Sequence, residues 1–360
     1  MYQFGDGFDN YGTSYNMVAG YPWSFIQGTA TVVTTDFRFA PPAGLPGGCV
    51  ELNQNNYLRQ NLIGNPNEMI VCFGFKTAAL PASGETLMIY FWDSGASQCG
   101  LAITSNGALQ FWRGDGNGNL KVAQIGPTST AGLVSPNTWY GFVADVVFSN
   151  TVGSVSLYMN GGATAVIPLT GSLNTGPSGH AYATQCSIGP DNSSTGLMKF
   201  DDVMMLDTTG AFFNSRPTTN TRIYTKVPTG IGTYTNWTPV GLTNNWQNAA
   251  VMPPSLSDYN LSNVDAQHDS YAVPLIGLTS SPLLVLVRGS LWEDDAQTHT
   301  PSLLMRTSVA DGGVDSIGAA TTALTSAPLF YDTPFQNDPN TGAPWSGPNA
   351  DAAQIGVVEG

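Results

Sequence analysis

The sequence has few charged residues. Asp, Glu, Lys and Arg together make up 10% of its 360 residues, against about 25% in an average soluble domain. Lys and Glu, which exposed helices normally need, are scarce, and Gly, Thr, Ser and Asn take their place. Because these residues favour strands and turns, the composition predicts an all-β protein.

Cations are especially scarce. The chain has 11 Lys and Arg against 25 Asp and Glu, which gives a formal net charge of −14. A surface of that sign repels phosphate backbones and anionic lipid. The few cations, among them Arg38, Arg59 and Lys76, are scattered along the sequence and form no basic patch. We therefore expect no nucleic-acid partner.

Long hydrophobic runs are also missing. No stretch approaches the roughly 20 apolar residues of a membrane span, and the best candidate, 283–287, is bounded by Pro282 and Arg288. The first residues lack the basic start and the apolar run of a signal peptide. We therefore expect that the protein does not insert into a membrane. We also expect that it is synthesised in a reducing cytoplasm.

Cysteine is too rare and too dispersed for a zinc site. The four cysteines form no Cys-x-x-Cys pair; they are Cys49, Cys72, Cys99 and Cys186. In a reducing cytoplasm we expect them to be buried free thiols, although their even number leaves two disulfides open. The sequence predicts neither a metal nor another cofactor.

Short apolar runs separated by Gly, Pro, Asn and Asp clusters make up much of the chain. Residues 69–75 and 87–92 are typical of such runs. Residues 109–112 and 120–123 flank a turn rich in Gly and Asn, which indicates a hairpin. No 3.6-residue periodicity persists between the runs, so the pattern predicts a sandwich of antiparallel sheets.

The composition changes after about residue 210. Residues 211–270 are rich in Thr, Asn, Pro and Trp and show little alternation, whereas strand-like runs return from Tyr271. We expect the middle part to lie over another surface because it cannot form a core of its own. The predicted parts are a sandwich at 1–210, an extended wrapping segment at 211–270 and a C-terminal β domain at 271–360.

Several segments resemble known proteins. Trp139-Tyr140 at a strand start and residues 153–161, which end in Asn-Gly, look like a concanavalin A-like (laminin-G-like) jelly roll. Residues 188–189 and 200–203 resemble its closing strands. The segments similar to bacteriophage virion proteins that carry this domain are 4–9, 21–23, 212–239 and 338–357. The resemblance implies a concanavalin A-like N-terminal sandwich in a virion structural protein.

Concanavalin A-like folds include glycoside hydrolases, which place two carboxyl groups on either side of a sugar. No two of the five Glu lie close together in the sequence; they are Glu51, Glu68, Glu85, Glu293 and Glu359. The acidic cluster 293–295 falls in an expected turn. We therefore predict no enzyme, while an Asp–Glu pair assembled by folding stays open.

Other polar clusters favour structural interpretations. Asp201-Asp202 could bind a metal or a sugar, but capping of backbone N–H groups is the commoner role of such Asp. Residues 115–119 resemble the first half of a calcium loop, but Leu120 and Gly126 stand where Gly and Glu are needed, so we expect a hairpin turn. The histidines lie far apart and outside any nucleophile motif; they are His180, His268 and His299.

Two exposed aromatics are the remaining candidates for a site. Trp237 and Trp246 lie in the polar segment 211–270. They could contact a neighbouring subunit or a glycan. Burial against a sheet of the same chain is an equally weighted alternative.

The sequence thus predicts a non-enzymatic structural component on the outside of a bacteriophage particle. We expect a capsid decoration, tail-fibre or tail-associated protein that contacts other virion proteins and copies of itself, forming a homo-oligomer. Its location would be the virion, assembled in the host cytoplasm. One alternative is a glycan-binding module that recognises the host surface, and another is a glycoside hydrolase.

Overall fold

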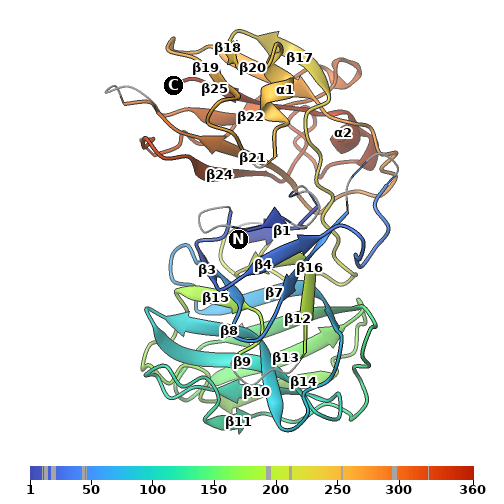
Figure 1. Ribbon diagram of the computed structural model, residues 1–360, viewed down its shortest axis with the longest axis vertical. Helices are drawn as coiled ribbons and strands as arrows, with labels where there is room; N and C mark the ends of the chain where they lie inside the picture. The colour runs from blue at the N-terminus through green and yellow to red at the C-terminus, as the bar shows by residue number, and fades with distance from the viewer. Residues whose placement is uncertain are drawn as a thin grey trace. The chain divides into compact units, whose positions relative to one another are not determined.

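The computed structural model describes residues 1–9, 11, 15–17, 22–42, 45, 47–191, 196–210, 213–252, 254–293, 298–322 and 324–360. The chain forms two compact units, each made mostly of strands (Figure 1). The first comprises Met1–Ala40 and Pro46–Tyr224, and the second comprises Pro41–Leu45 and Thr225–Gly360. The all-β class predicted from composition is confirmed.

The first unit is a sandwich of two antiparallel sheets. The nine-stranded sheet has the order β14-β13-β12-β7-β16-β5-β4-β2, with β1 paired to β16. Its strands are β1 (Tyr2–Asp6), β2 (Tyr15–Asn16), β4 (Ala30–Val33), β5 (Cys49–Leu52), β7 (Glu68–Thr77), β12 (Tyr140–Val147), β13 (Gly153–Met159), β14 (Ile167–Leu173) and β16 (Met198–Leu206).

The seven-stranded sheet has the order β11-β10-β9-β8-β15-β6-β3. Its strands are β3 (Phe25–Gln27), β6 (Tyr57–Asn61), β8 (Glu85–Asp93), β9 (Ala96–Thr104), β10 (Leu109–Arg113), β11 (Ala123–Ile125) and β15 (Gln185–Ile188). Hairpin neighbours such as β8 and β9 alternate with pairings of distant strands, such as β15 with β6 and β8. This arrangement is the concanavalin A-like jelly-roll sandwich that the sequence predicts.

Aromatic side chains fill the core of the sandwich. Phe73, Phe75, Phe142 and Phe200, from three neighbouring strands of the nine-stranded sheet, have ring centroids 5.6–6.3 Å apart. Phe91 of β8 lies 5.2 Å from Phe148, which follows β12. Burial of each such ring contributes about 2–3 kcal/mol, so this cluster holds the two sheets together.

The N-terminal motif 4–9 is structural. The buried Asp6 carboxylate accepts hydrogen bonds from Trp23 Nε1 (2.9 Å), from the Tyr11 hydroxyl (2.7 Å) and from the Phe8 backbone N–H (3.0 Å). The rings of Phe8 and Trp23 stack with centroids 6.2 Å apart. A buried carboxylate with three donors is satisfied, so these residues fix the start of the chain.

The second unit contains smaller sheets. A five-stranded sheet has the order β17-β20-β25-β22-β23, and β18-β19 and β21-β24 form two-stranded sheets. The elements of the second unit are β17 (Gly230–Thr235), β18 (Thr238–Val240), α1 (Asn245–Ala249), β19 (Tyr259–Leu261), β20 (His268–Ala272), β21 (Val285–Leu291), β22 (Ser302–Arg306), η1 (Val309–Asp311), β23 (Asp315–Ile317), β24 (Leu329–Phe335), α2 (Gly347–Ala352) and β25 (Gln354–Val358). Trp345 lies fully buried in its core.

The boundary between the two compact units differs from the boundaries predicted from the sequence. The first unit extends to Tyr224 rather than residue 210. Residues 213–229 contain no helix or strand, whereas the rest of 211–270 includes β17, β18, β19, α1 and part of β20. These strands are short, and β20 pairs with β25 far along the chain. Local alternation therefore gave little sign of them.

All four cysteines are buried free thiols, as the sequence predicts, and the disulfide alternative does not hold. Burial raises the pKa of each thiol, that of Cys72 to about 12. In the part of the chain that the structure describes, no helix has the length and apolar character needed to cross a membrane.

Candidate functional site

The outer face of the seven-stranded sheet carries a row of aromatic and polar side chains. In β8, Phe91 points into the sandwich, so Tyr90 and Trp92 point to the other side. Directly paired residues of antiparallel strands lie on the same face, which extends the row across all seven strands. From β3 to β11 the row is Phe25, Arg59, Ser187, Tyr90, Gly100, Trp112 and Gln124.

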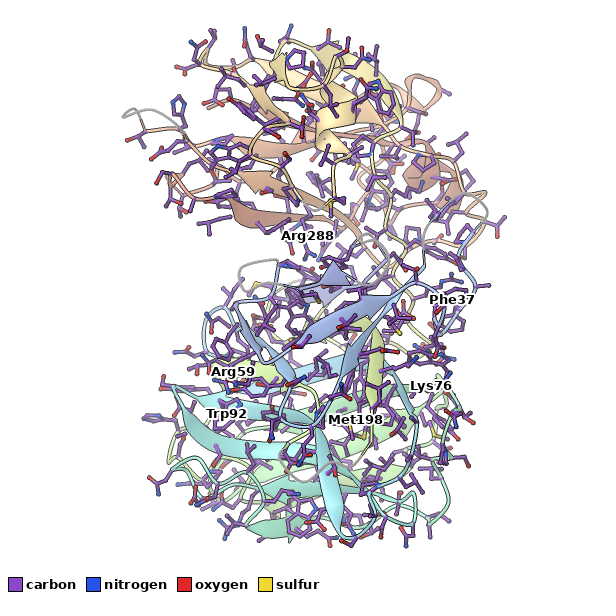
Figure 2. All side chains as sticks on the ribbon, in the orientation of Figure 1. Phe37, Arg59, Lys76, Trp92, Met198 and Arg288 are labelled. Atoms are coloured by element: carbon purple, nitrogen blue, oxygen red, sulfur yellow. The ribbon has the colours of Figure 1, made fainter. Side chains whose placement is uncertain are left out.

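Arg59 lies against aromatic rings in this row. Its Cζ is 4.7 Å from the ring centroid of Trp92, 5.0 Å from that of Tyr57 and 5.6 Å from that of Phe25. Figure 2 shows Arg59 beside Trp92. Its Nε donates to Ser187 Oγ and its Nη2 donates to the Tyr57 hydroxyl, both at 3.1 Å. These contacts hold the guanidinium in one orientation.

A pocket of about 500 Å³ opens on this face. Tyr57, Tyr90 and Trp92 line it from the sheet, and residues 118–121 and 190–191 line it from two loops. The remaining lining residues, Gln27 and Asn55, are exposed amides. The pocket therefore combines aromatic rings with hydrogen-bonding groups at its edges.

The loop between β10 and β11 closes one side of the pocket. Leu120 packs against the cluster that contains Tyr90 and Trp92. Lys121 Nζ donates to the Glu85 carbonyl oxygen (2.6 Å) and lies 3.0 Å from Asp191 Oδ2. The sequence predicts a strand at 120–123, but β11 starts only at Ala123 because the side chains at 120 and 121 fasten the loop to the sheet.

The turn at 115–119 is the hairpin turn that the sequence predicts. Asp115 Oδ1 accepts hydrogen bonds from the backbone N–H groups of Asn117 (2.7 Å) and Asn119 (3.1 Å). These bonds lower the pKa of the Asp115 carboxyl. Among the described residues, no group of three or more His, Cys, Asp or Glu side chains is placed to hold a metal ion.

Asp201 and Asp202 cap backbone groups, which agrees with the structural interpretation. Asp201 accepts from the backbone N–H groups of Arg38 (2.8 Å) and Asp202 (2.7 Å), and Asp202 accepts from that of Ile223 (2.7 Å). The Arg38 guanidinium lies 3.7 Å from Asp202. Burial raises the pKa of Asp202 to about 6 and that of Asp201 well above its usual value.

Folding also assembles an Asp–Glu pair, the alternative that the sequence leaves open. Asp145 of β12 and Glu68 of β7 share the outer face of the nine-stranded sheet. Burial, followed by the charge and hydrogen bond of Glu68, raises the pKa of Asp145 to about 7. Hydrolytic carboxyl pairs stand about 5 Å or more apart to admit the substrate. Because these two carboxyl groups bond to each other, no sugar fits between them.

A Ser, a His and an Asp meet at the end of β8. His180 Nδ1 lies 2.6 Å from Asp93 Oδ2, and Ser178 Oγ donates to the same oxygen at 2.9 Å. Nucleophilic catalysis requires the imidazole to reach the hydroxyl. Here both groups bind the carboxylate instead, so the cluster fastens the loop at 178–180.

Trp237 and Trp246 both lie in the second unit and are half-buried. Trp237 Nε1 donates to the Gln267 carbonyl oxygen at 3.2 Å, and Trp246 belongs to α1. Their role in subunit or glycan contacts stays a prediction.

In the cluster 293–295, the backbone N–H of Glu293 donates to the Thr325 carbonyl oxygen (3.0 Å), and the two Asp lie outside the described residues.

The sequence pattern does not single out the residues of the outer row as a site. Arg59 appears there only as a scattered cation, and Tyr57 and Trp92 are not proposed as site residues. Alternation within 57–61 and 87–92 offers a signal, since each run places aromatic or polar residues on one face. Which of the two faces remains open depends on strand partners that are distant in the sequence.

No family model matches the sequence, and a search of curated proteins finds no match. Solved structures with similar folds include an alginate lyase from Pseudomonas aeruginosa (TM-score 0.31, 15% identity, 52% of this chain and 87% of that one). The catalytic domain of a glycoside hydrolase family 131 protein from Coprinopsis cinerea gives a TM-score of 0.34 at 14% identity, with 56% and 85% covered.

The receptor-binding domain of a botulinum neurotoxin mosaic serotype C/D is also similar. Its TM-score is 0.32 at 12% identity, with 78% of this chain and 70% of that chain covered. Similarities this distant carry no information about what this chain binds. The fold assignment rests on the strand order itself, and any function has to be argued from the side chains of the chain.

Proposed function

We propose that the outer face of the seven-stranded sheet binds a glycan and that the protein acts through binding rather than catalysis. The observation that supports this is the row of aromatic side chains beside a pocket of about 500 Å³. Small-molecule sites of this size are lined by aromatic and apolar groups with a few polar groups that fix orientation. A sugar ring matches that description because it has an apolar C–H face and a rim of hydroxyls.

The side chains available to a sugar are suitably placed. Phe25 is 41% exposed, and Tyr57 is half-buried. Their rings are 5.9 Å apart at the centroids, which offers an apolar surface for a sugar ring. The amides of Gln27 and Asn119 are exposed at the edge, where they can donate to and accept from hydroxyls.

The chemistry of the pocket favours binding over bond cleavage. Among the described lining residues, Asp191 is the one carboxylate, and Lys121 holds it in an ion pair at 3.0 Å. Canonical glycoside hydrolysis uses two carboxyl groups. Burial raises the pKa of Tyr90, so its phenol stays protonated and is not set up as a base.

Glycan binding is tested with aromatic variants. The wild-type protein should bind members of a glycan array, and Phe25→Ala and Tyr57→Ala should each weaken binding about tenfold, as loss of an aromatic contact at a binding site does. Leu169→Ala, at a more exposed apolar position (71%) on the other sheet, serves as the control and should bind normally. Unchanged binding by Tyr57→Ala, or release of reducing ends from the bound glycan, would refute the proposal.

We further propose that the chain is carried on the outside of a bacteriophage particle, where such a module would meet the host surface. The support is the sequence resemblance of residues 4–9 and 338–357 to virion proteins. An antibody against the protein should label the surface of intact purified particles in electron micrographs. Unlabelled particles that also lack the chain in mass spectra would contradict this proposal and leave the glycan site unaffected.

A further inference from the structure

Arg59 differs from the other cations of this acidic chain. Seven of the 11 Lys and Arg form an ion pair with a carboxylate in the described residues; they are Arg38, Lys76, Lys121, Lys199, Lys226, Arg288 and Arg306. Three more donate to backbone carbonyl oxygens; they are Arg113, Arg216 and Arg222. Arg59 instead donates to neutral side chains alone in the part of the chain that is described.

Among the residues that the structure describes, the partners of Arg59 leave some of its N–H donors unused. Nε donates to Ser187 Oγ, Nη1 to Gln185 Oε1 (3.4 Å) and Nη2 to the Tyr57 hydroxyl. A guanidinium has five N–H groups, so one N–H on Nη1 and one on Nη2 remain. Two N–H groups on adjacent nitrogens form the fork that binds an oxyanion through two parallel bonds.

The surroundings strengthen such a bond. The ring centroids of Trp92 and Tyr57 lie 4.7 and 5.0 Å from the guanidinium carbon of Arg59. These rings keep water from part of the guanidinium, and a hydrogen bond between charged groups is stronger where water is excluded. The side chain is also already oriented, so a ligand would not have to order it on binding.

We propose that the glycan bound on this face carries an acidic group, a carboxylate or a sulfate, that pairs with Arg59. This inference rests on the proposed function, because it concerns the ligand of the same face. It identifies the class of ligand: an acidic saccharide whose sugar rings contact Phe25 and Tyr57 while its anion reaches the guanidinium.

The net charge of −14 limits how acidic that glycan can be. A dense polyanion would place many charges near a negative protein and be repelled, although charges beyond about 10 Å are screened at 0.1 M salt. Within the pocket, Lys121 neutralises Asp191. The site therefore suits a glycan with isolated acidic residues rather than a uniformly charged one.

The test compares acidic probes with neutral versions of themselves by calorimetry. One pair is a glucuronate-containing oligosaccharide and its carboxyl-reduced form, and the other is a sulfated galactose oligosaccharide and its desulfated form. Wild-type protein should bind at least one acidic member about tenfold or more tightly than its neutral counterpart. Arg59→Gln should lose this preference, Arg59→Lys should keep part of it, and the control Arg113→Gln should keep all of it.

The outcomes separate the two proposals. Equal binding of acidic and neutral members would overturn the inference about ligand class and leave glycan binding intact. Binding of no probe, acidic or neutral, by the wild-type protein would count against both. If Arg59→Gln fails to fold, as judged by thermal melting, the wild-type preference and the Arg59→Lys variant decide the question. Which pair shows the preference distinguishes a carboxylate from a sulfate.

Discussion

The two outer faces of the sandwich differ in the partners of their charged side chains. On the nine-stranded sheet, the outward charged groups are bound by the chain itself, as where Arg38 lies against Asp202. On the seven-stranded sheet, Arg59 faces outward among aromatic rings and neutral partners. On the first face the charged side chains stabilise the fold, and on the second face we propose that Arg59 contacts a ligand.

The chain itself covers the first face. Arg38 Nη1 donates to the Thr221 carbonyl oxygen (3.1 Å), and the Arg216 guanidinium carbon lies 3.6 Å from the ring centroid of Tyr158. A Cβ added to Gly141 of β12 would overlap the Arg38 guanidinium. Glycine at this position therefore makes room for a buried charge, and residues 216–223 lie over it.

Removing the buried cation of the nine-stranded sheet should have the largest effect on stability. Arg38→Met should lower the free energy of unfolding by about 3–5 kcal/mol, because Asp201 and Asp202 would remain buried without their positive partner. Urea unfolding measures this loss. A loss below about 1 kcal/mol would mean that the outer face of the nine-stranded sheet does not depend on its internal charges.

The pH dependence tests another buried group on the same face. Asp145 has a pKa of about 7 in the folded state, above its usual value of 3.8. The native state therefore keeps a proton that the unfolded chain releases, and this group makes stability fall as the pH rises from about 4 to 7. Asp145→Asn cannot lose a proton and should be more stable than wild type at pH 7.5 by about 2 kcal/mol, since each pKa unit is worth about 1.4 kcal/mol and solvent weakens the effect of a group that is only half-buried.

The measurement is the difference between variant and wild type at pH 4.5 and 7.5, which removes the contributions of Asp202 and Asp269, both with a pKa of about 6. Asp36→Asn is the control, because burial raises the pKa of Asp36 but its hydrogen bonds with Lys199, Lys76 and Trp139 together outweigh burial and lower the pKa to about 2. That variant should lose stability about equally at both pH values. An Asp145→Asn difference that does not change with pH would show that the Asp145–Glu68 pair keeps no extra proton.

The matched change on the other face should have a smaller effect. Arg59→Met removes the same charge as Arg38→Met, but its partners Ser187, Gln185 and Tyr57 are neutral. We expect a loss of about 1 kcal/mol in the free energy of unfolding, typical of a hydrogen-bonded side chain. A loss as large as that of Arg38→Met would place Arg59 among the structural charges and remove the contrast between the faces.

The sequence allowed the fold class and several strands to be predicted, because a run such as 69–75 has the composition of a buried strand and lies within β7. It also indicated that Asp201 and Asp202 cap backbone groups. It could not reveal the row through Phe25, Arg59 and Ser187, since these residues are brought together by pairings between β3, β6 and β15. Register between distant strands has no local signal, so the candidate site required the structure.

The smallest expected effect concerns thiol reactivity and distinguishes the two faces without changing stability. Cys72 lies on the outer side of the nine-stranded sheet, where the Thr221 hydroxyl bonds to it. Cys99 and Cys186 point into the sandwich, beside Leu101 and Phe91. Because burial raises the pKa of all three thiols, alkylation at pH 8 requires an opening of the structure.

Different openings should expose these thiols. Local release of residues 216–223 is enough for Cys72, whereas Cys99 and Cys186 require separation of the two sheets, which amounts to unfolding of the sandwich. Alkylation of the native protein, followed by peptide mass spectrometry, should therefore label Cys72 first and the other two later, at a common rate. Denatured, unreduced protein should show all four thiols at once as the control. If Cys99 reacts as fast as Cys72, the segment 216–223 is not a separable cover, and the nine-stranded sheet opens only together with the rest of the sandwich.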